Sequence, residues 1–248
     1  MPGVEHRIAR EASSRNGSIP TNLRAVSRDF VPSKKLTNVE PGRVVHSIIP
    51  LSVLEMMRRQ DIPAVDELDE YHVELKSRRL GMSHTVAREI DRYRQLARRD
   101  QRVTRAEAIA LLQLAGRRRD AALLFAEAGR VAADLAAQQV SAVARGTWHS
   151  LPRIGRLRMG RVLAKRLLKG IFDVEFVELG SDMVVSTRDS VLIEATPQGS
   201  ACALVGSATA TLLRAFMDFE GAVQHEKCQA LGESECQWRT SSPEGNDG

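Results

Sequence analysis

Three cysteines and one histidine near the end of this 248-residue sequence could together hold a metal ion. Cys202, Cys228 and Cys236 are its only cysteines, and His225 lies three residues before the second of them. Three soft thiolates completed by one imidazole or carboxylate form a closed tetrahedral set that suits zinc and leaves no position open for catalysis. The residues therefore predict a structural zinc site. The alternative is that Cys202 is a buried small side chain and the other two are neighbouring core thiols.

The last two cysteines are expected on facing strands of a hairpin around Gly232. If the connecting loop is residues 231–233, Cys228 lies opposite Cys236 on one face of the sheet, where paired Cβ atoms are about 4.5–5.5 Å apart. Cys202 is expected at the start of the preceding helix, within reach of the same place.

Two residues compete for the fourth position of the predicted site. His225 and Cys228 are separated by an odd number of positions, so they would point to opposite faces of a regular strand. A bulge must intervene if His225 is a ligand. Glu226, which shares a face with Cys228, is the substitute.

Apolar periodicity and turn residues predict the elements that position these side chains. Three helices are predicted in the first half of the chain: residues 50–57 with Pro50 in the first turn, a helix capped by Ser83, and a helix that follows the capping box of Thr104 and Glu107. Three more are predicted after them: residues 120–144 ended by Gly146, a helix that follows Pro152 and stops at Gly170, and a helix from Ala201. The predicted strands are residues 44–49, 172–176, 183–186, 191–195 and two strands that flank Gly232. This order predicts an α+β fold with helices packed on a mostly antiparallel sheet.

The predicted helix after Pro152 has an apolar and a basic side. Its apolar positions, expected to be buried, are Met159, Val162, Leu163 and Leu167. Its basic positions, which could contact an anionic group, include Arg158, Arg161 and Lys165. The alternative is a solvated helix face in an arginine-rich protein.

Composition indicates an ordinary globular protein, with 43% hydrophobic, 27% charged and 4% aromatic residues and a net charge of +5. These values exclude collagen-like, low-complexity and fully disordered chains. The first forty residues lack the apolar stretch of a secretory signal, and no segment is apolar enough for a transmembrane helix. With an odd number of cysteines, we expect reduced thiols and a cytoplasmic location.

The sequence resembles the 4-vinyl-reductase, or hydrocarbon-binding, domain family over roughly residues 117–241. The matching features are the alanine-rich helix at residues 125–134, the region of Leu179 and Gly180, the helix that holds Cys202, and the spacing of Cys228 and Cys236. The overall plan is most similar to the stand-alone members that take part in bacteriochlorophyll synthesis.

The resemblance implies a structural zinc at Cys202, His225, Cys228 and Cys236, with His225 where the aromatic-sensing members have a glutamate. It also implies the ligand-binding fold of vesicle-tethering subunits and haem-based nitric-oxide sensors at residues 117–241. Around this domain we expect a disordered or loosely docked arm at 1–36, a mainly helical N-terminal region at 37–116 and a tail at 242–248.

Such a fold surrounds an apolar pocket between helices and sheet. The candidate ligand-binding residues are Phe172, Phe176 and Phe216, which could equally be plain core, together with Trp148 and His149 on an expected loop at 146–152. The alternative for the last two is a half-buried anchor and a solvated histidine.

Binding is the expected function, because the chain lacks a nucleophile elbow, a phosphate loop and a dinucleotide fingerprint. We expect a carrier or sensor of a small hydrophobic ligand such as a tetrapyrrole intermediate, with a homodimer or a protein partner. The alternatives are a dimerising adaptor and a vinyl reductase or accessory factor in bacteriochlorophyll synthesis. Nucleic acid is disfavoured as a partner, since no helix-turn-helix or zinc-finger spacing is present.

Overall fold

The chain folds as an α+β structure with antiparallel sheets, as predicted. A computed structural model describes residues 44–61, 82–179 and 182–241, which all belong to one compact unit. The predicted arm at 1–36, residues 62–81 of the predicted helical N-terminal region and the tail at 242–248 lie outside the described residues. None of the described helices has the length and apolar content needed to cross a bilayer.

The described helices are α1 (Ile48–Asp61), α3 (Met82–Arg98), α4 (Arg105–Gly116), α5 (Ala121–Gln138), α6 (Ala142–Ser150), α7 (Arg153–Phe172), α8 (Val191–Ala195) and α9 (Cys202–Met217). The strands are β1 (Val44–His46), β2 (Arg102–Thr104), β3 (Glu175–Leu179), β4 (Asp182–Thr187), β5 (Ala222–Lys227) and β6 (Cys236–Ser241). Strands β1 and β2 form a small antiparallel pair, and the larger sheet has the order β3-β4-β6-β5.

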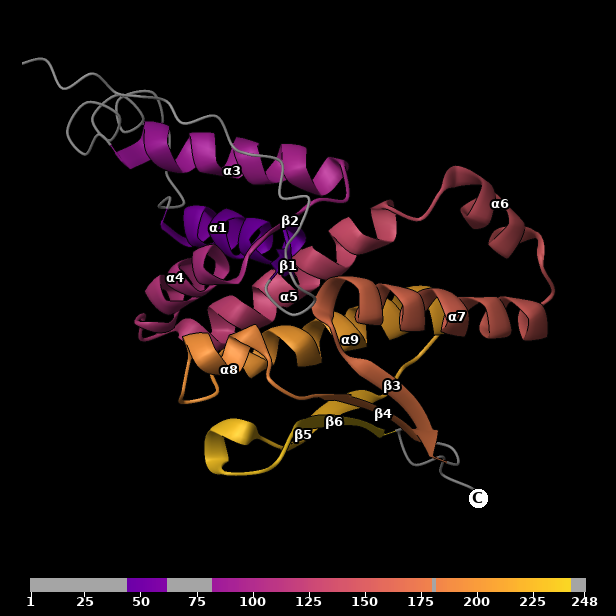
Figure 1. The fold of residues 1–248 in the computed structure, drawn as a ribbon. Coiled ribbons are helices and arrows are strands. Elements are labelled where there is room, and N and C mark those ends of the chain that lie inside the picture. The colour runs from indigo at the N-terminus through magenta and orange to yellow at the C-terminus, as the bar shows by residue number, and fades with distance from the viewer. Residues whose placement is uncertain (1–43, 62–81, 180–181, 242–248) are drawn as a thin grey trace, which may run out of the picture. The chain divides into compact units, whose positions relative to one another are not determined.

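Helices stack in layers on one face of the larger sheet (Figure 1). In this sheet Val185 pairs with Phe176 on β3 and with Trp238 on β6, and all three side chains are buried. Because paired residues share a face, these side chains mark the face covered by α7 and α9. Helix α5 packs on α9, and α1 packs on α5 (Figure 1).

Small residues allow the helices on either side of α9 to approach it closely. A Cβ atom at Gly129 of α5 would overlap the backbone carbonyl of Leu204, and one at Gly160 of α7 would overlap the carbonyl oxygen of Phe216. Helix α5 also turns Ala128, Ala132 and other alanines inward. Backbone contact therefore replaces large side chains in these two helix pairs.

The long predicted helix at 120–144 is in fact two helices. Helix α5 ends at Gln138, and the Ser141 hydroxyl accepts a hydrogen bond from the Ala144 N–H at 3.2 Å, which caps the new helix α6. Gly146 lies inside α6 instead of ending a helix, so the expected loop at 146–152 is wrong for most of its length.

Helix α7 runs past Gly170, where the sequence predicts its end. It stops at Phe172 because Asp173 adopts a left-handed conformation (φ 52°) and donates its backbone N–H to the Leu168 carbonyl. The following strand therefore begins at Glu175 and not at Phe172.

The predicted buried face of α7 is also wrong. Val162 is 65% exposed, and Leu163 and Leu167 are only partly buried. The buried positions are instead Gly160, Ala164, Leu168, Ile171 and Phe172. The positions of large apolar residues predict which face of a helix is buried. In α7 the buried face consists partly of glycine and alanine, which carry little apolar surface, so this pattern points to the wrong face.

Three further local predictions need correction. Residues 191–195 form helix α8 and not a strand. The Ser190 hydroxyl caps this helix by accepting a hydrogen bond from the Leu192 N–H at 3.2 Å.

The strand predicted at 44–49 ends at His46, and α1 begins at Ile48. The loop of the last hairpin is longer than 231–233, since it spans the eight residues between Lys227 and Cys236.

We predict that Gly160→Ala lowers the free energy of unfolding by about 1–3 kcal/mol, because the added methyl group must push α7 away from the Phe216 carbonyl. Gly170→Ala in the same helix is the matched control, since a Cβ atom there meets nothing within 4 Å. It should leave stability unchanged or raise it by up to about 1 kcal/mol through helix propensity. Urea unfolding of both variants measures the difference, and equal effects would contradict the close approach.

Candidate metal centre

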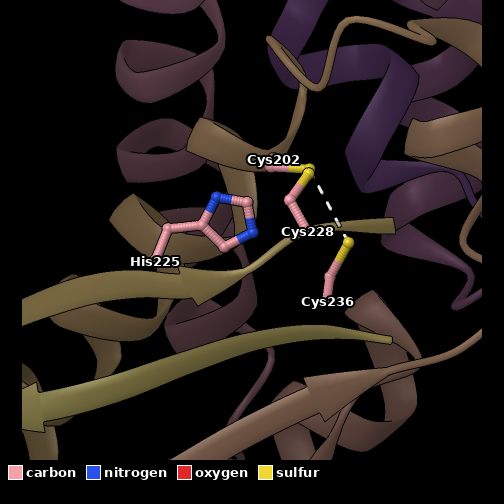
Figure 2. Close-up of side chains that lie close together, drawn as sticks. All are labelled: Cys202, His225, Cys228 and Cys236. Carbon is pink, nitrogen blue, oxygen red and sulfur yellow. Dashed lines mark hydrogen bonds between the residues drawn. The ribbon is translucent and has the colours of Figure 1, made fainter. Parts of the chain in front are cut away.

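The four side chains predicted to bind metal lie together at one end of the sheet (Figure 2). Their ligand atoms are all within 4.8 Å of one another, and the Cys202 Sγ lies 3.9 Å from both the Cys228 Sγ and the Cys236 Sγ. In a tetrahedral site with metal–sulfur bonds of about 2.3 Å, two sulfur atoms are about 3.8 Å apart. The observed spacing is therefore that of a tetrahedral metal site and is too long for a disulfide.

Helix α9 supplies Cys202 as its first residue, and the preceding turn sets its position. The Thr196 hydroxyl accepts from the Ala201 N–H at 3.2 Å and donates to the Leu192 carbonyl at 2.8 Å, which ties the turn to α8. Gly199 has φ +76°, and a Cβ atom there would lie 3.1 Å from the Cys228 Sγ. Only glycine fits this turn, for its conformation and for the room it leaves beside the sulfur.

The loop between β5 and β6 supplies the other two thiols. Cys228 follows β5, and its carbonyl accepts from the N–H groups of Leu231 (2.9 Å) and Glu233 (3.2 Å), which folds the loop into a turn. The Gln229 N–H lies 3.4 Å from the Cys236 Sγ and donates to it. The backbone of the loop therefore positions both thiols before any metal binds.

The bulge needed to bring His225 to the cysteines is present. His225 pairs with Trp238, but Lys227 pairs with Gln237, so Glu226 is an extra residue on β5. The Glu226 carboxylate lies 2.8 Å from the Nε of Arg239, on the neighbouring strand β6, and it does not belong to the cluster. Of the two candidates for the fourth ligand, the structure therefore brings His225 to the site.

The imidazole of His225 stacks on the indole of Trp238, with ring centroids 4.8 Å apart and an angle of 13° between the planes. Trp238 is buried, and a Cβ atom at Gly206 of α9 would lie 3.2 Å from its ring. The three cysteines are buried, whereas His225 is exposed. The stack therefore fixes the orientation of the one ligand that water reaches.

Hydrogen bonds within the cluster favour a thiolate at Cys236. The hydrogen bond from the Cys202 thiol lowers the pKa of Cys236 against the opposing effect of burial, and those from His225 and the Gln229 N–H act in the same direction as the Cys202 bond. The same Cys202–Cys236 hydrogen bond, together with burial, raises the pKa of Cys202. Thiolate is the form of cysteine that binds metal.

The predicted ligand-binding residues do not gather around the metal cluster. Phe172, Phe176 and Phe216 are buried in the shared core. Trp148 packs edge-to-face on Phe216, with centroids 5.8 Å apart, and its Nε1–H donates to the Arg156 carbonyl at 3.0 Å. For His149 the structure describes the backbone in α6, and the side chain lies outside what is described. Their role in ligand binding stays a prediction.

The basic positions predicted to meet an anion are exposed on α7. Arg161 pairs with Glu178 at 2.9 Å, whereas Arg158 and Lys165 point to solvent. The sequence reasoning missed a separate cleft of about 560 Å³ that α7 lines together with the ends of α3 and α5. Its only sequence signal was Arg166, which lies in the acid-free stretch between Asp134 and Asp173.

Comparison with known proteins identified no relative: no protein-family model, no curated protein and no solved structure matches this chain. The resemblance to the 4-vinyl-reductase domain therefore stays a prediction.

We predict that His225→Ala weakens metal binding by more than about 100-fold, because a direct ligand matters at least as much as the groups that orient one. Glu226→Gln, one residue away, should leave the metal affinity unchanged, because it removes only a solvent-screened ion pair with Arg239. Titration with Co²⁺, followed through the thiolate-to-cobalt charge-transfer band, compares the two variants. Loss of the band in Glu226→Gln alone would mean that the carboxylate is the ligand.

Proposed function

We propose that this chain is a zinc-stabilised protein that binds a small hydrophobic ligand. The cluster of Cys202, His225, Cys228 and Cys236 carries the zinc part of the proposal, because its ligand atoms lie within 4.8 Å of one another. Three thiolates and one imidazole in tetrahedral spacing are a ligand set that selects zinc.

The zinc has a structural role in this proposal. All four positions are filled by protein side chains, which leaves no site for an activated water or a substrate. One ligand begins α9, and the others come from the β5–β6 hairpin, so the ion joins the end of a central helix to the sheet. Its binding free energy thereby adds to the stability of the fold.

Two observations support a hydrophobic ligand. The motifs that resemble the 4-vinyl-reductase family include three of the proposed zinc ligands, and that family binds hydrophobic molecules, with tetrapyrrole intermediates as the plausible class here. The structure also has a cleft of about 560 Å³, within the range of about 300–1,000 Å³ typical of small-molecule sites. The protein would carry or sense this ligand for a partner.

A dimerising adaptor is the second candidate function. Val143 of α6 and Ile154 and Val162 of α7 are 79%, 70% and 65% exposed, an unusual amount of apolar surface for two adjacent helices. An interface between two copies would bury these side chains.

Native mass spectrometry of the freshly purified full chain tests these proposals together. We expect one zinc ion per chain, any retained ligand as added mass, and the oligomeric state from the same spectrum. Cys228→Ser should lose the zinc, whereas a metal-free wild-type protein would refute the zinc site. A monomer at every concentration measured would refute the adaptor, and Ile154→Lys should convert any dimer to monomer.

We further predict that a chelator lowers the unfolding temperature of the wild-type protein, because zinc binds the folded state more tightly than the unfolded chain. Cys228→Ser should unfold at the lower temperature with or without chelator.

The carrier role is tested by a micromolar titration with protoporphyrin and by binding of a hydrophobic dye. If the protein binds neither, the carrier role is refuted.

A further inference from the structure

The cleft lies where three segments that are distant in the sequence meet. Its walls are the end of α3 with the turn to β2, the turn between α5 and α6, and the second half of α7. Part of its lining is apolar and is formed largely by Val140, Ala144, Leu163, Leu167 and Ile171. Leu163 and Leu167, which the sequence assigned to the buried core, are instead part of this wall.

The cleft also has an excess of positive charge. Its lining includes Arg98, Arg102 and Arg166 and one acidic residue, Asp100. Among the residues that the structure describes, neither Arg98 nor Arg166 has a carboxylate partner. Arg94, one turn earlier on α3, shows the usual arrangement in this protein, since it pairs with both Glu55 and Asp91. Within the described part of the chain, the two cleft arginines therefore have no counter-charge that would compete with a bound anion.

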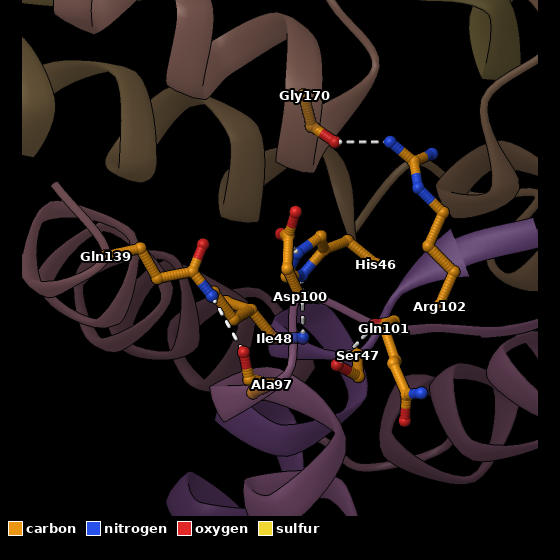
Figure 3. A network of polar contacts seen from close by, with 9 residues as sticks. All are labelled: His46, Ser47, Ile48, Ala97, Asp100, Gln101, Arg102, Gln139 and Gly170. Carbon is orange, nitrogen blue, oxygen red and sulfur yellow. Dashed lines mark hydrogen bonds and ion pairs between the residues drawn. The ribbon is translucent and has the colours of Figure 1, made fainter. Parts of the chain in front are cut away.

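The one acidic residue of the cleft is already engaged. The Nδ1 of buried His46 accepts from the Ile48 N–H at 3.2 Å, so its Nε2 carries the hydrogen and donates to the Asp100 carboxylate at 3.0 Å (Figure 3). Burial lowers the pKa of His46, which keeps this neutral form near pH 7. Asp100 thus serves to hold the α3–β2 turn. Because the cleft has three arginines and this one carboxylate, its lining keeps an excess of positive charge.

A polar network holds the walls of the cleft in place (Figure 3). The Gln139 side-chain amide donates to the Ala97 carbonyl at 2.9 Å, which joins the α5–α6 turn to α3. Arg102 donates to the Gly170 carbonyl at 2.9 Å, which joins the α3–β2 turn to α7. The Ser47 hydroxyl donates to the Gln101 carbonyl at 2.7 Å. A site whose walls are fixed in this way loses little entropy when a ligand binds.

We propose that this cleft is the ligand site and that it takes an apolar molecule bearing an anionic group, either a carboxylate or a phosphate. The anion lies on the guanidinium groups of Arg98 and Arg166, and the apolar part lies on Ala144, Leu163 and Leu167. Guanidinium groups bind both kinds of anion through paired hydrogen bonds. This inference rests on the proposed carrier function and names the place and the chemical class of its ligand.

Calorimetric titration of the full chain with three probes of equal chain length tests the inference. The probes are decanoate and decyl phosphate, each below its micelle concentration, and decanol below its limit of solubility. At least one of the two anions should bind about tenfold or more tightly than decanol, because a charged hydrogen-bonded head adds roughly 1.5–3 kcal/mol. The stronger of the two anions identifies the head group that the site prefers.

Variants of the wall locate the binding site. Arg98→Gln and Arg166→Gln should each weaken binding of the preferred anion about tenfold and leave decanol binding unchanged. Arg158→Gln is the matched control, because it removes an exposed arginine of the same helix that does not line the cleft. Gly170→Leu places a side chain where a Cβ atom meets nothing within 4 Å, and it should block all three probes. Thermal unfolding confirms that each variant is folded.

Each contrary outcome has a distinct meaning. Equal affinity for decanol and both anions, or equal losses in Arg158→Gln and Arg166→Gln, would overturn the recognition of an anion. Probe binding that survives Gly170→Leu would overturn the cleft as the site and leave the carrier function standing. Failure of every probe, protoporphyrin included, to bind the wild-type protein would overturn both.

Discussion

Helix α9 can lie at the centre of this molecule because small residues face it from two sides. Gly129 of α5 and Gly160 of α7 each bring a neighbouring helix to within backbone contact of α9, where any larger residue would overlap a carbonyl group. The indole of Trp238 packs against Gly206 on the side of α9 that faces the sheet. The place of α9 is thus fixed by close packing on three sides, and with it the place of its first residue, Cys202.

A metal ion held by the cluster of Cys202, His225, Cys228 and Cys236 would complete what this packing leaves open. The loop between β5 and β6 extends beyond the sheet, and Leu231 in it is 83% exposed, so apolar burial does little to hold the loop. Its thiols face Cys202 across a gap of 3.9 Å. A tetrahedral ion would therefore join this loop to the first residue of α9, and its binding free energy would add to the stability of the fold.

Local chemistry made much of the site predictable, and contacts between distant segments explain the rest. The three cysteines, and the need for a bulge if His225 joins them, follow from residue type and strand alternation, which leave Glu226 as the other candidate for the fourth position. The location of the bulge, at Glu226, is a matter of the register between β5 and β6, which no local pattern encodes. The buried face of α7 could not be read from its large apolar residues, because Gly160 and Ala164 make the contact. The cleft depends on segments that meet only in the folded chain.

The metal cluster and the cleft share no residue, so metal binding can influence a ligand in the cleft only through the packing of the helices. No metal-ligating residue lines the cleft, so the metal cannot contact a ligand bound there. The two sites are nevertheless linked by packing, because α9 begins with Cys202 and contacts α7 at Gly160, and α7 carries Leu163, Arg166 and Leu167 into the cleft. Loss of the metal would loosen the hairpin first and leave the α7–α9 contact in place. Anion recognition should therefore depend on the arginines of the cleft and only weakly on the occupancy of the metal centre.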